Sequence, residues 1–376
     1  MKTAIARTDN SILGRWWWTV DHPLLGALSV LFIVGTVLNF SATPAIAAHL
    51  KLDTYFLVRH QIVFMILSAL VMIGVSLQTP KTIRLISLAM TAAMLVCLVL
   101  VLVHGTQIKG ASRWIRVFGI SLQPSEFAKP AFAVVAAWLI SLGKSNPHVK
   151  GTLWTAGLYL VLVGLLIKQP DFGMVLTVSV IFGIELFLSG LPMSWISALI
   201  LAGGIGATSA YFLLPHVQAR IDRFINPEAG DTFQVRTAFE AIRNGGLFGM
   251  GPGEGTVKNI LPDAHTDFVL AVAAEEFGLF VTLLIVLLFA FIVYRGFLLI
   301  LTKDKNLFTL LAVSGLLAQF GMQALVNMAS TLSLIPTKGM TLPFVSYGGS
   351  SLLSLGFAMG MVLGLTRSTN TGKDTP

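Results

Sequence analysis

The sequence predicts an all-α polytopic membrane protein with about ten transmembrane helices, and three observations indicate this fold class. Hydrophobic residues make up 55% of the 376-residue chain, whereas charged residues make up only 11%. Several apolar runs reach about 20 residues, the length that crosses the hydrocarbon core of a bilayer. A long polar stretch, residues 215–265, separates the first seven apolar runs from the last three. We therefore expect a single membrane domain, residues 1–376, with a large extracytoplasmic loop between helices 7 and 8.

The chain begins with a segment, residues 1–22, that we expect to be cytoplasmic and interfacial. It carries basic residues followed by three consecutive tryptophans, and indole rings favour the headgroup level of a membrane. Residues 24–214 then hold seven predicted spans, at 24–47, 57–77, 85–103, 126–142, 153–167, 172–188 and 191–214. Residues 266–365 hold the other three, at 266–294, 307–334 and 342–365, and a cytoplasmic tail follows at 366–376.

The short loops indicate which side of the membrane the termini occupy. Lys81 and Arg84 lie in one short loop, Lys144 and Lys150 lie in another, and neither loop contains an acidic residue. Short loops rich in Lys and Arg stay in the cytoplasm. Both termini are therefore expected in the cytoplasm of a multi-pass inner-membrane protein. The outer face then carries more cations than the orientation alone predicts, and an anionic ligand on that face would explain them.

Composition also excludes several classes of site. Cys97 is the single cysteine, so the chain forms no internal disulfide and no cysteine-based metal site. The seven histidines are scattered without helical metal-ligand spacing, so no metal-binding residue is assigned. Basic residues do not alternate with aromatic ones, which argues against a nucleic-acid partner.

Charged residues within or beside the spans predict a cationic cavity on the outer face. A buried ion costs about 2.5–3.5 kcal/mol on insertion scales, so each one needs a partner or a function. Glu126 and Lys129 are three residues apart and can form a self-neutralising salt bridge. Arg59 and Arg113 can extend to the lipid headgroups, or they can bind a ligand together with Lys338.

Two glycine-rich segments are open to more than one interpretation. Residues 245–255 read GGLFGMGPGEG, which either forms a flexible outer loop or lets backbone N–H groups approach phosphate oxygens. Residues 341–351 read TLPFVSYGGSS and open the last predicted span, where small residues and hydroxyls favour close helix packing.

Asp267 lies where the long polar stretch ends and the eighth span begins. One interpretation is structural, because Thr266 or Asp267 can cap the helix by accepting from its free N–H groups. The other is that Asp267 is a catalytic carboxylate at the membrane surface.

Five motifs in a fixed order resemble the SEDS family of membrane proteins, the FtsW/RodA/SpoVE group. They are GASRW at 110–114, QPSEFAK at 123–129, QPDFG at 169–173, LPDAHTDF at 261–268 and the segment 323–351. The resemblance covers most of the chain and implies ten spans in a GT-C-like fold. PTKG at 336–339 and the tryptophan-rich N-terminus are similar to the alphaproteobacterial form of the division branch. The elongation branch, which usually lacks the lysine, is the sibling alternative.

The resemblance implies a peptidoglycan glycosyltransferase that polymerises lipid II during septal wall synthesis, with Asp267 as the catalytic base. It implies substrate-binding roles for the residues Arg59, Arg113, Glu126, Lys129, Gln323, Ser346 and Lys338. The implied partners are undecaprenyl-diphosphate-linked glycan, a class B penicillin-binding protein that supplies the transpeptidase, and regulatory proteins of the divisome. No cofactor is assigned, although Mg²⁺ or Mn²⁺ can assist at the diphosphate.

Two other functions are compatible with a cationic cavity. A lipid II flippase would use the same cavity without chemistry, and a scaffold would only recruit a transpeptidase. The chain also departs from the family pattern, because many relatives carry an acid where Asn259 stands here. Glu254 in the glycine-rich segment is a candidate replacement for that acid.

Overall fold

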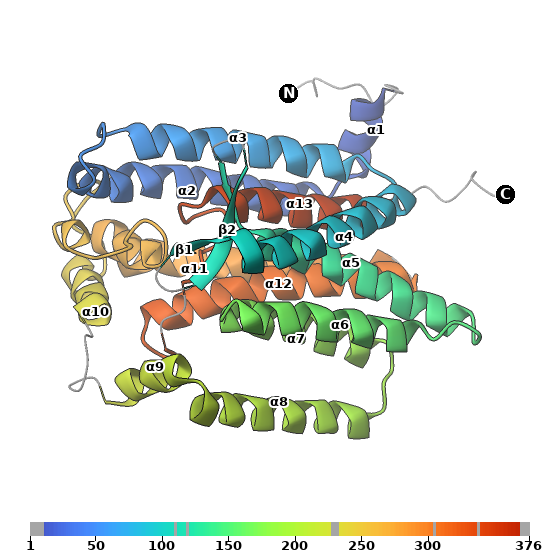
Figure 1. Ribbon diagram of the computed structural model, residues 1–376. Helices are drawn as coiled ribbons and strands as arrows, with labels where there is room; N and C mark the ends of the chain where they lie inside the picture. The colour runs from blue at the N-terminus through green and yellow to red at the C-terminus, as the bar shows by residue number, and fades with distance from the viewer. Residues whose placement is uncertain are drawn as a thin grey trace.

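The computed structural model describes residues 11–108, 111–117, 120–226, 233–303, 306–336 and 339–368. Within these residues, ten apolar helices lie with their axes in roughly the same direction (Figure 1). They are α2 (His22–His49), α3 (Phe56–Ser76), α4 (Pro80–His104), α5 (Pro124–Ser145), α6 (Gly151–Lys168), α7 (Phe172–Leu188), α8 (Met193–Leu213), α11 (Val269–Lys303), α12 (Leu307–Thr331) and α13 (Gly349–Leu365). Eight of the described helices are long and apolar enough to cross a membrane, while α7 and α13 are shorter apolar helices of 17 residues. The ten predicted apolar spans therefore appear as helices in the predicted order, and eight of them reach spanning length.

Local sequence signals explain where several of these helices begin. Asp21 caps α2 by accepting from the N–H of Leu24, and Thr79 caps α4 in the same way. A proline lies in the first turn of each helix, Pro23 at the second position of α2 and Pro80 at the first position of α4, where its missing N–H costs nothing. The same proline signal opens α5 at Pro124.

The centre of the bundle is formed by α5, α12 and α13. α5 lies between α4 and α12, and α13 packs along α3. Gly356 and Gly360 allow that close approach, because a Cβ atom at either position would lie 2.5–2.6 Å from a backbone oxygen of α3. In contrast, α8 lies apart at the lower edge of Figure 1 and none of its residues is buried.

The start and end of the described chain meet at one end of the bundle. The short helix α1 (Ile12–Thr19) packs there, where the indole N–H of Trp16 donates to Ser76 Oγ at 2.8 Å. The N–H of Ser368, just after α13, donates to the carbonyl of Thr19 at 3.0 Å. This arrangement agrees with the predicted even number of spans.

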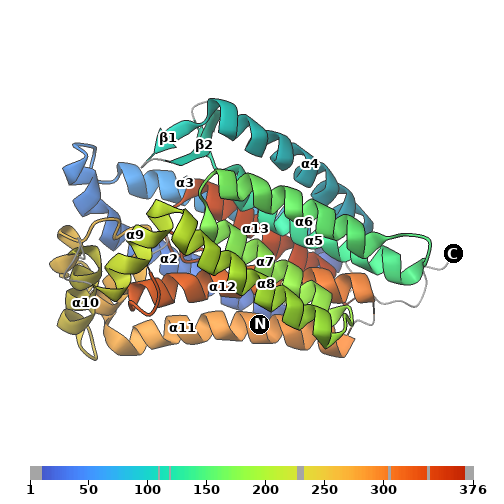
Figure 2. The ribbon, with the colours of Figure 1, turned by 60° about the horizontal axis from the view of Figure 1, so that its bottom comes forward.

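The opposite end carries the shorter elements (Figure 2). β1 (Thr106–Ile108), β2 (Ala111–Val117) and β3 (Ile120–Leu122) form an antiparallel sheet in the order β1-β2-β3, which was not predicted. The predicted large loop contains two amphipathic helices, α9 (Pro215–Ile225) and α10 (Phe233–Gly245), and the 3₁₀ turn η2 (Val257–Asn259). This end of the protein is therefore more ordered than a polar loop.

Three predicted helix starts differ from the structure by three or more residues, and the first of them is the third span, expected from residue 85, whereas α4 begins at Pro80. The eighth span was expected from residue 266 and the tenth from residue 342, whereas α11 begins at Val269 and α13 at Gly349. Residues 339–348 instead form non-helical turns. Leu342, Phe344 and Val345 are nevertheless buried, so their apolar character reflects burial without a helix.

The glycine-rich segment 245–255 packs against a break in α11. Gly278 adopts φ 77° and ψ 179° inside this helix, which interrupts its hydrogen-bond ladder. The N–H groups of Met250 and Gly251 donate to the freed carbonyls of Glu275 and Glu276 at 2.9 and 3.0 Å. These N–H groups are used within the protein, so the phosphate-binding interpretation of the segment is wrong for Met250 and Gly251.

Candidate active site

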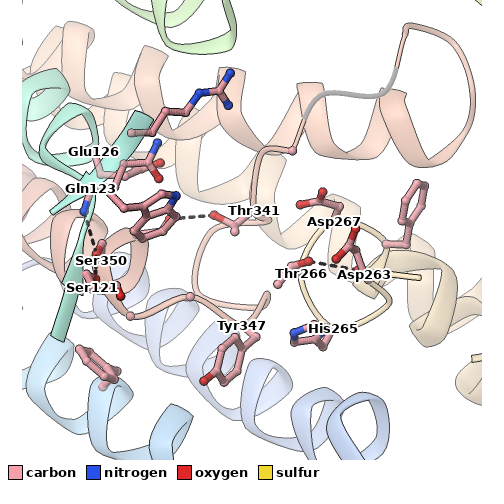
Figure 3. A pocket seen from close by; sticks show the side chains of 18 of the residues that line it. Ser121, Gln123, Glu126, Asp263, His265, Thr266, Asp267, Thr341, Tyr347 and Ser350 are labelled. Atoms are coloured by element: carbon pink, nitrogen blue, oxygen red, sulfur yellow. Dashed lines mark hydrogen bonds between the residues drawn. The ribbon is translucent and has the colours of Figure 1, made fainter. Parts of the chain in front are cut away.

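A cavity of about 730 Å³ opens at the end of the bundle that carries β2, α9 and α10. Figure 3 shows Gln123 and Glu126 on one side of it and Asp263, Thr266 and Asp267 on the other. Residues 339–351 contribute the floor between these two sides through Thr341, Tyr347 and Ser350, among others. Four of the five predicted motifs, those at 110–114, 123–129, 261–268 and 323–351, thus contribute to the lining of one space.

Asp267 lies on the cavity wall and outside the following helix. The carbonyl of Asp263, a residue with φ 54°, accepts from the N–H groups of Thr266 and Asp267 and closes a tight turn. The Thr266 hydroxyl donates to the same carbonyl at 3.2 Å. Phe268 directly precedes α11 and its carbonyl accepts from Ala271, so Phe268 holds the cap position. Asp267 therefore lies one residue before the cap position and lines the cavity.

Neighbouring elements hold the backbone of this turn in place. Asn327 on α12 donates to the carbonyls of Asp267 at 2.9 Å and Met340 at 2.7 Å. Ser346 accepts from the N–H of Leu342 and donates to the carbonyl of Thr266. Ser346 is a predicted binding residue that is buried and absent from the lining, so its position suits it to anchor the turn.

The carboxylate of Asp267 faces Gly339, which has no side chain. A Cβ atom at Gly339 would lie 3.2 Å from a carboxylate oxygen of Asp267. Any larger residue at position 339 would therefore crowd the carboxylate, and glycine keeps this side of the cavity open.

Arginine residues supply positive charge to the cavity. Arg113 on β2 donates to the carbonyls of Gln169 and Pro170, and its Nε lies 3.7 Å from a carboxylate oxygen of Asp171. Its side chain remains 31% exposed, so it is fixed by its neighbours and still reaches the cavity. Arg220 on α9 also lines the cavity and was not predicted from the sequence.

Lys129 is completely buried behind the cavity wall. Its Nζ lies 3.0 Å from Glu126 Oε2 and 3.2 Å from Gln323 Oε1, which confirms the predicted salt bridge. Gln323 in turn donates to Thr341 and Ser351, which do line the cavity. Of the three predicted residues Glu126, Lys129 and Gln323, only Glu126 contacts the cavity directly.

Other predicted residues are not part of this cavity. Arg59 lies on the exposed outer end of α3, where it pairs with Asp53 at 2.7 Å, and it is absent from the lining. Glu254 and Asn259 are exposed and also absent from the lining, so Glu254 does not replace the missing acid inside the cavity. Lys338 lies outside the described residues.

The cavity is also lined by His60, His265 and Tyr347, which were not predicted as site residues from the sequence. Tyr347 Oη and His60 Nδ1 are 3.0 Å apart, and the Tyr347 ring lies 5.2 Å from that of His265. Burial lowers the pKa of His265 to about 4, against the opposing effect of the Asp263 carboxylate. His265 is therefore neutral at pH 7. Its place in the 261–268 motif was the signal that could have identified it.

The described residues contain no group of three or more His, Cys, Asp or Glu side chains arranged to hold a metal ion. Asp263 and Asp267 both line the cavity, as does Glu126 from the other side. Mg²⁺ usually takes one or two carboxylates together with substrate phosphates. The residues present therefore fit a cation shared with a diphosphate better than a cation held by protein alone.

Known proteins are similar to this chain over most of its length. Residues 22–371 match the family of cell cycle proteins FtsW, RodA and SpoVE. A protein of Caulobacter vibrioides named probable peptidoglycan glycosyltransferase FtsW is 43% identical, over 97% of this chain and 93% of that protein. A protein of Escherichia coli O157:H7 with the same name is 34% identical, over 94% of this chain and 87% of that protein.

Two solved structures share the fold over nearly the whole chain. A chain described under "Structural coordination of polymerization and crosslinking by a peptidoglycan synthase complex" superposes with a TM-score of 0.78 at 28% identity, covering 93% of this chain and 98% of that one. The rod shape determining protein RodA of Thermus thermophilus gives a TM-score of 0.69 at 28% identity, covering 93% and 97%. The chain, with its ten apolar helices and its motif residues gathered around one cavity, belongs to the FtsW/RodA/SpoVE family.

Proposed function

We propose that this protein is a peptidoglycan glycosyltransferase that polymerises lipid II into glycan strands during septal wall synthesis. One observation carries the proposal: Asp267 shares a cavity of about 730 Å³ with Arg113 and Arg220. A base and two anion-binding groups therefore face the same space, whose volume lies within the roughly 300–1,000 Å³ of ligand sites. The relatives named peptidoglycan glycosyltransferases support this assignment.

The proposed reaction joins the growing glycan to the next lipid II. The C4 hydroxyl of the acceptor sugar is a weak nucleophile, and a carboxylate within hydrogen-bond reach activates it. Asp267 accepts the hydroxyl proton while the oxygen bonds to the anomeric carbon of the donor glycan. The bond from that carbon to the diphosphate breaks, and undecaprenyl diphosphate leaves with the electron pair. A single displacement converts an α-linked donor to a β-1,4 linkage.

The leaving diphosphate gains negative charge, which fixed cations stabilise. Arg113 and Arg220 contact the cavity and are assigned this role, and Lys338 is the proposed third cation. Lys129 lies behind the wall and is neutralised by Glu126, so its role is to hold Glu126 and Gln323 in place. The carboxylates of Asp263 and Asp267 would hold a divalent cation, which would supply further positive charge to stabilise the leaving group.

The proposed partner and location follow from the same comparisons. A chain with this fold occurs in a structure described as a peptidoglycan synthase complex that couples polymerisation and crosslinking. The described part of the protein consists of ten apolar helices and short elements at one end of the bundle, and a class B penicillin-binding protein would supply the crosslinking domain. The FtsW name shared by the curated relatives favours the division septum over cell elongation.

The experiment is polymerisation of lipid II by the purified protein with its cognate transpeptidase. Asp267→Asn keeps the size of the side chain but removes the base, so glycan strands should form with wild type and be lost with the variant. A loss of about 10²-fold or more is expected for a general base in direct contact with the reacting hydroxyl. Size-exclusion chromatography and a thermal melt show whether the variant is folded.

Each of three outcomes would contradict all or part of the proposal. Full activity in Asp267→Asn would remove the base role from this residue. A wild-type protein that makes no strands, but moves lipid II across vesicle membranes, would establish the flippase instead. A protein that does neither and still stimulates its transpeptidase would be a scaffold.

A further inference from the structure

A cluster of buried polar residues lies beneath the loop that leads to Asp267. Lys258, Glu275 and Glu276 are 6%, 0% and 1% exposed, although each carries an ionisable group. Together with Ser41 on α2 they form what we call the Lys258 clasp. The members of the clasp are absent from the cavity lining, so none of them is in contact with a substrate there.

Glu275 fixes the backbone of the loop. Its carboxylate accepts from three successive N–H groups, those of Thr256 and Val257 at 2.8 Å and that of Lys258 at 3.0 Å. Three charge-assisted hydrogen bonds on consecutive residues leave that short stretch little freedom to rotate. Glu275 itself lies on α11, three residues before the break at Gly278.

Lys258 fixes the loop to two separate helices. Its ammonium group pairs with Glu276 on α11 and lies 3.1 Å from Ser41 Oγ on α2. It also donates to the carbonyl of Gly253 at 3.0 Å, which closes the glycine-rich segment onto the same point. Ser41 donates to the same Glu276 oxygen, so α2, α11 and the loop meet at one carboxylate. Breaking a buried ion pair strongly destabilises a protein, because it leaves an uncompensated buried charge. The pair of Lys258 and Glu276 therefore holds the loop firmly against α2 and α11.

The clasp is connected to Asp267 by a chain of short-range contacts. The N–H groups of Ile260 and Leu261 donate to the carbonyl of Val257. Leu261 and Phe268 then pack into a small hydrophobic cluster that also contains Val257. The turn that carries Asp267 lies between Leu261 and Phe268. Its position therefore depends on the clasp on one side and on Asn327 and Ser346 on the other.

We propose that Lys258, through its clasp with Glu276, Glu275 and Ser41, is a positioning residue that holds the Asp267 carboxylate in its reactive place. This inference rests on the proposed role of Asp267 as the base. A displacement of a catalytic group by about 1 Å can reduce a rate by 10²-fold, so a clasp outside the cavity can still control the rate. Substrate binding is separate, because the cations of the cavity do not belong to the clasp.

The test measures kcat and KM for lipid II in the polymerisation assay. Lys258→Met keeps most of the side-chain volume and removes the charge. We expect kcat to fall at least about tenfold, while KM stays within about twofold of wild type. Ser41→Ala removes only hydrogen bonds, is expected to fold, and should lower kcat about threefold with the same KM.

The matched control is the ion pair between Arg295 and Asp21, which joins the same two helices α2 and α11. Arg295 donates to the two Asp21 oxygens at 3.1 and 2.7 Å, and neither residue lines the cavity. Arg295→Met should lower thermal stability without changing kcat of the folded protein.

The outcomes separate this inference from the proposed function. The positioning role would be overturned if wild type polymerises lipid II and the variants Lys258→Met and Ser41→Ala have the same kcat as wild type. A rise in KM at constant kcat would overturn it too, because the clasp would then act on binding. An inactive wild type would instead contradict the proposed function.

Discussion

His265 lines the cavity beside Tyr347, and its imidazole titrates far from its ordinary range. Burial lowers its pKa from 6.5 to about 4, so the folded protein keeps this ring neutral under mildly acidic conditions. The unfolded chain regains the ordinary pKa and binds a proton at a higher pH. Between about pH 6.5 and pH 4 the unfolded state therefore binds more protons than the folded state, and acid favours unfolding.

We predict that this residue makes the protein less stable as the pH falls through that window. The stability contribution is fully present above about pH 7 and is lost progressively toward pH 4. His265→Gln has no titrating ring, so its thermal melts in detergent should lose less stability over the same pH range than those of wild type. Parallel curves for the two proteins between pH 7 and pH 4.5 would contradict the prediction.

The charged residues show what a sequence can and cannot predict about single positions. The three-residue spacing predicted the pair of Glu126 and Lys129, because neighbours on one helix face are set by the helix period. Arg59 and Arg113 look alike along the chain, and only the fold separates them. Arg113 reaches the cavity because Gln169 and Pro170 hold it there, whereas Arg59 extends outward to Asp53. Contacts between distant segments have no periodic signal.

At the scale of elements, the break in α11 and the glycine-rich segment form one unit. The N–H groups of Leu279 and Phe280, just after the break, donate to the carbonyls of Gly246 and Leu247. Gly249 has φ 83°, and a Cβ atom there would lie 2.1 Å from the carbonyl oxygen of Glu276. Two separate requirements, a left-handed backbone and a close approach, therefore select glycine at this position.

We predict that Gly249→Ala destabilises the protein by about 3 kcal/mol or more, because backbone strain and a steric clash add. Gly253→Ala is the matched control. Its φ of 87° is equally unfavourable for alanine, but nothing lies within 4 Å of the added atom. Only the strain of about 1–2 kcal/mol should then remain. Thermal melts of the two variants in the same detergent measure the difference, and equal losses would show that the close approach is unimportant.

The helices themselves were predictable because twenty apolar residues in a row have few alternatives in a bilayer. The sheet β1-β2-β3 was missed because its strands have three to seven residues and lack an apolar run. Residues 342–348, which form turns, were assigned to a helix because Leu342, Phe344 and Val345 are apolar, and the structure buries all three without a helix. An apolar run predicts burial. It predicts a helix only where the backbone N–H and C=O groups have no other hydrogen-bond partners in the protein.

At the scale of the whole molecule, the cavity and the chain ends occupy opposite ends of the bundle. α1 and the end of α13 lie at one end, where Trp16 and Ser368 make their hydrogen bonds. The cavity lies at the other end, with α9, α10 and the sheet (Figure 2). If the termini are in the cytoplasm, the cavity opens on the outer face, where glycan strands are needed.

We predict this orientation for the protein in cells, and cysteine labelling tests it. Asn146 lies in the exposed turn between α5 and α6, and Glu254 lies in the exposed glycine-rich segment at the cavity end. In a Cys97→Ala background, a membrane-impermeant maleimide should label Glu254→Cys in intact spheroplasts. Asn146→Cys should react only after the membrane is permeabilised, because its loop carries the basic residues that retain it inside. The reverse pattern would place Asp267 and both cavity arginines in the cytoplasm, where a polymerase of exported strands could not use them.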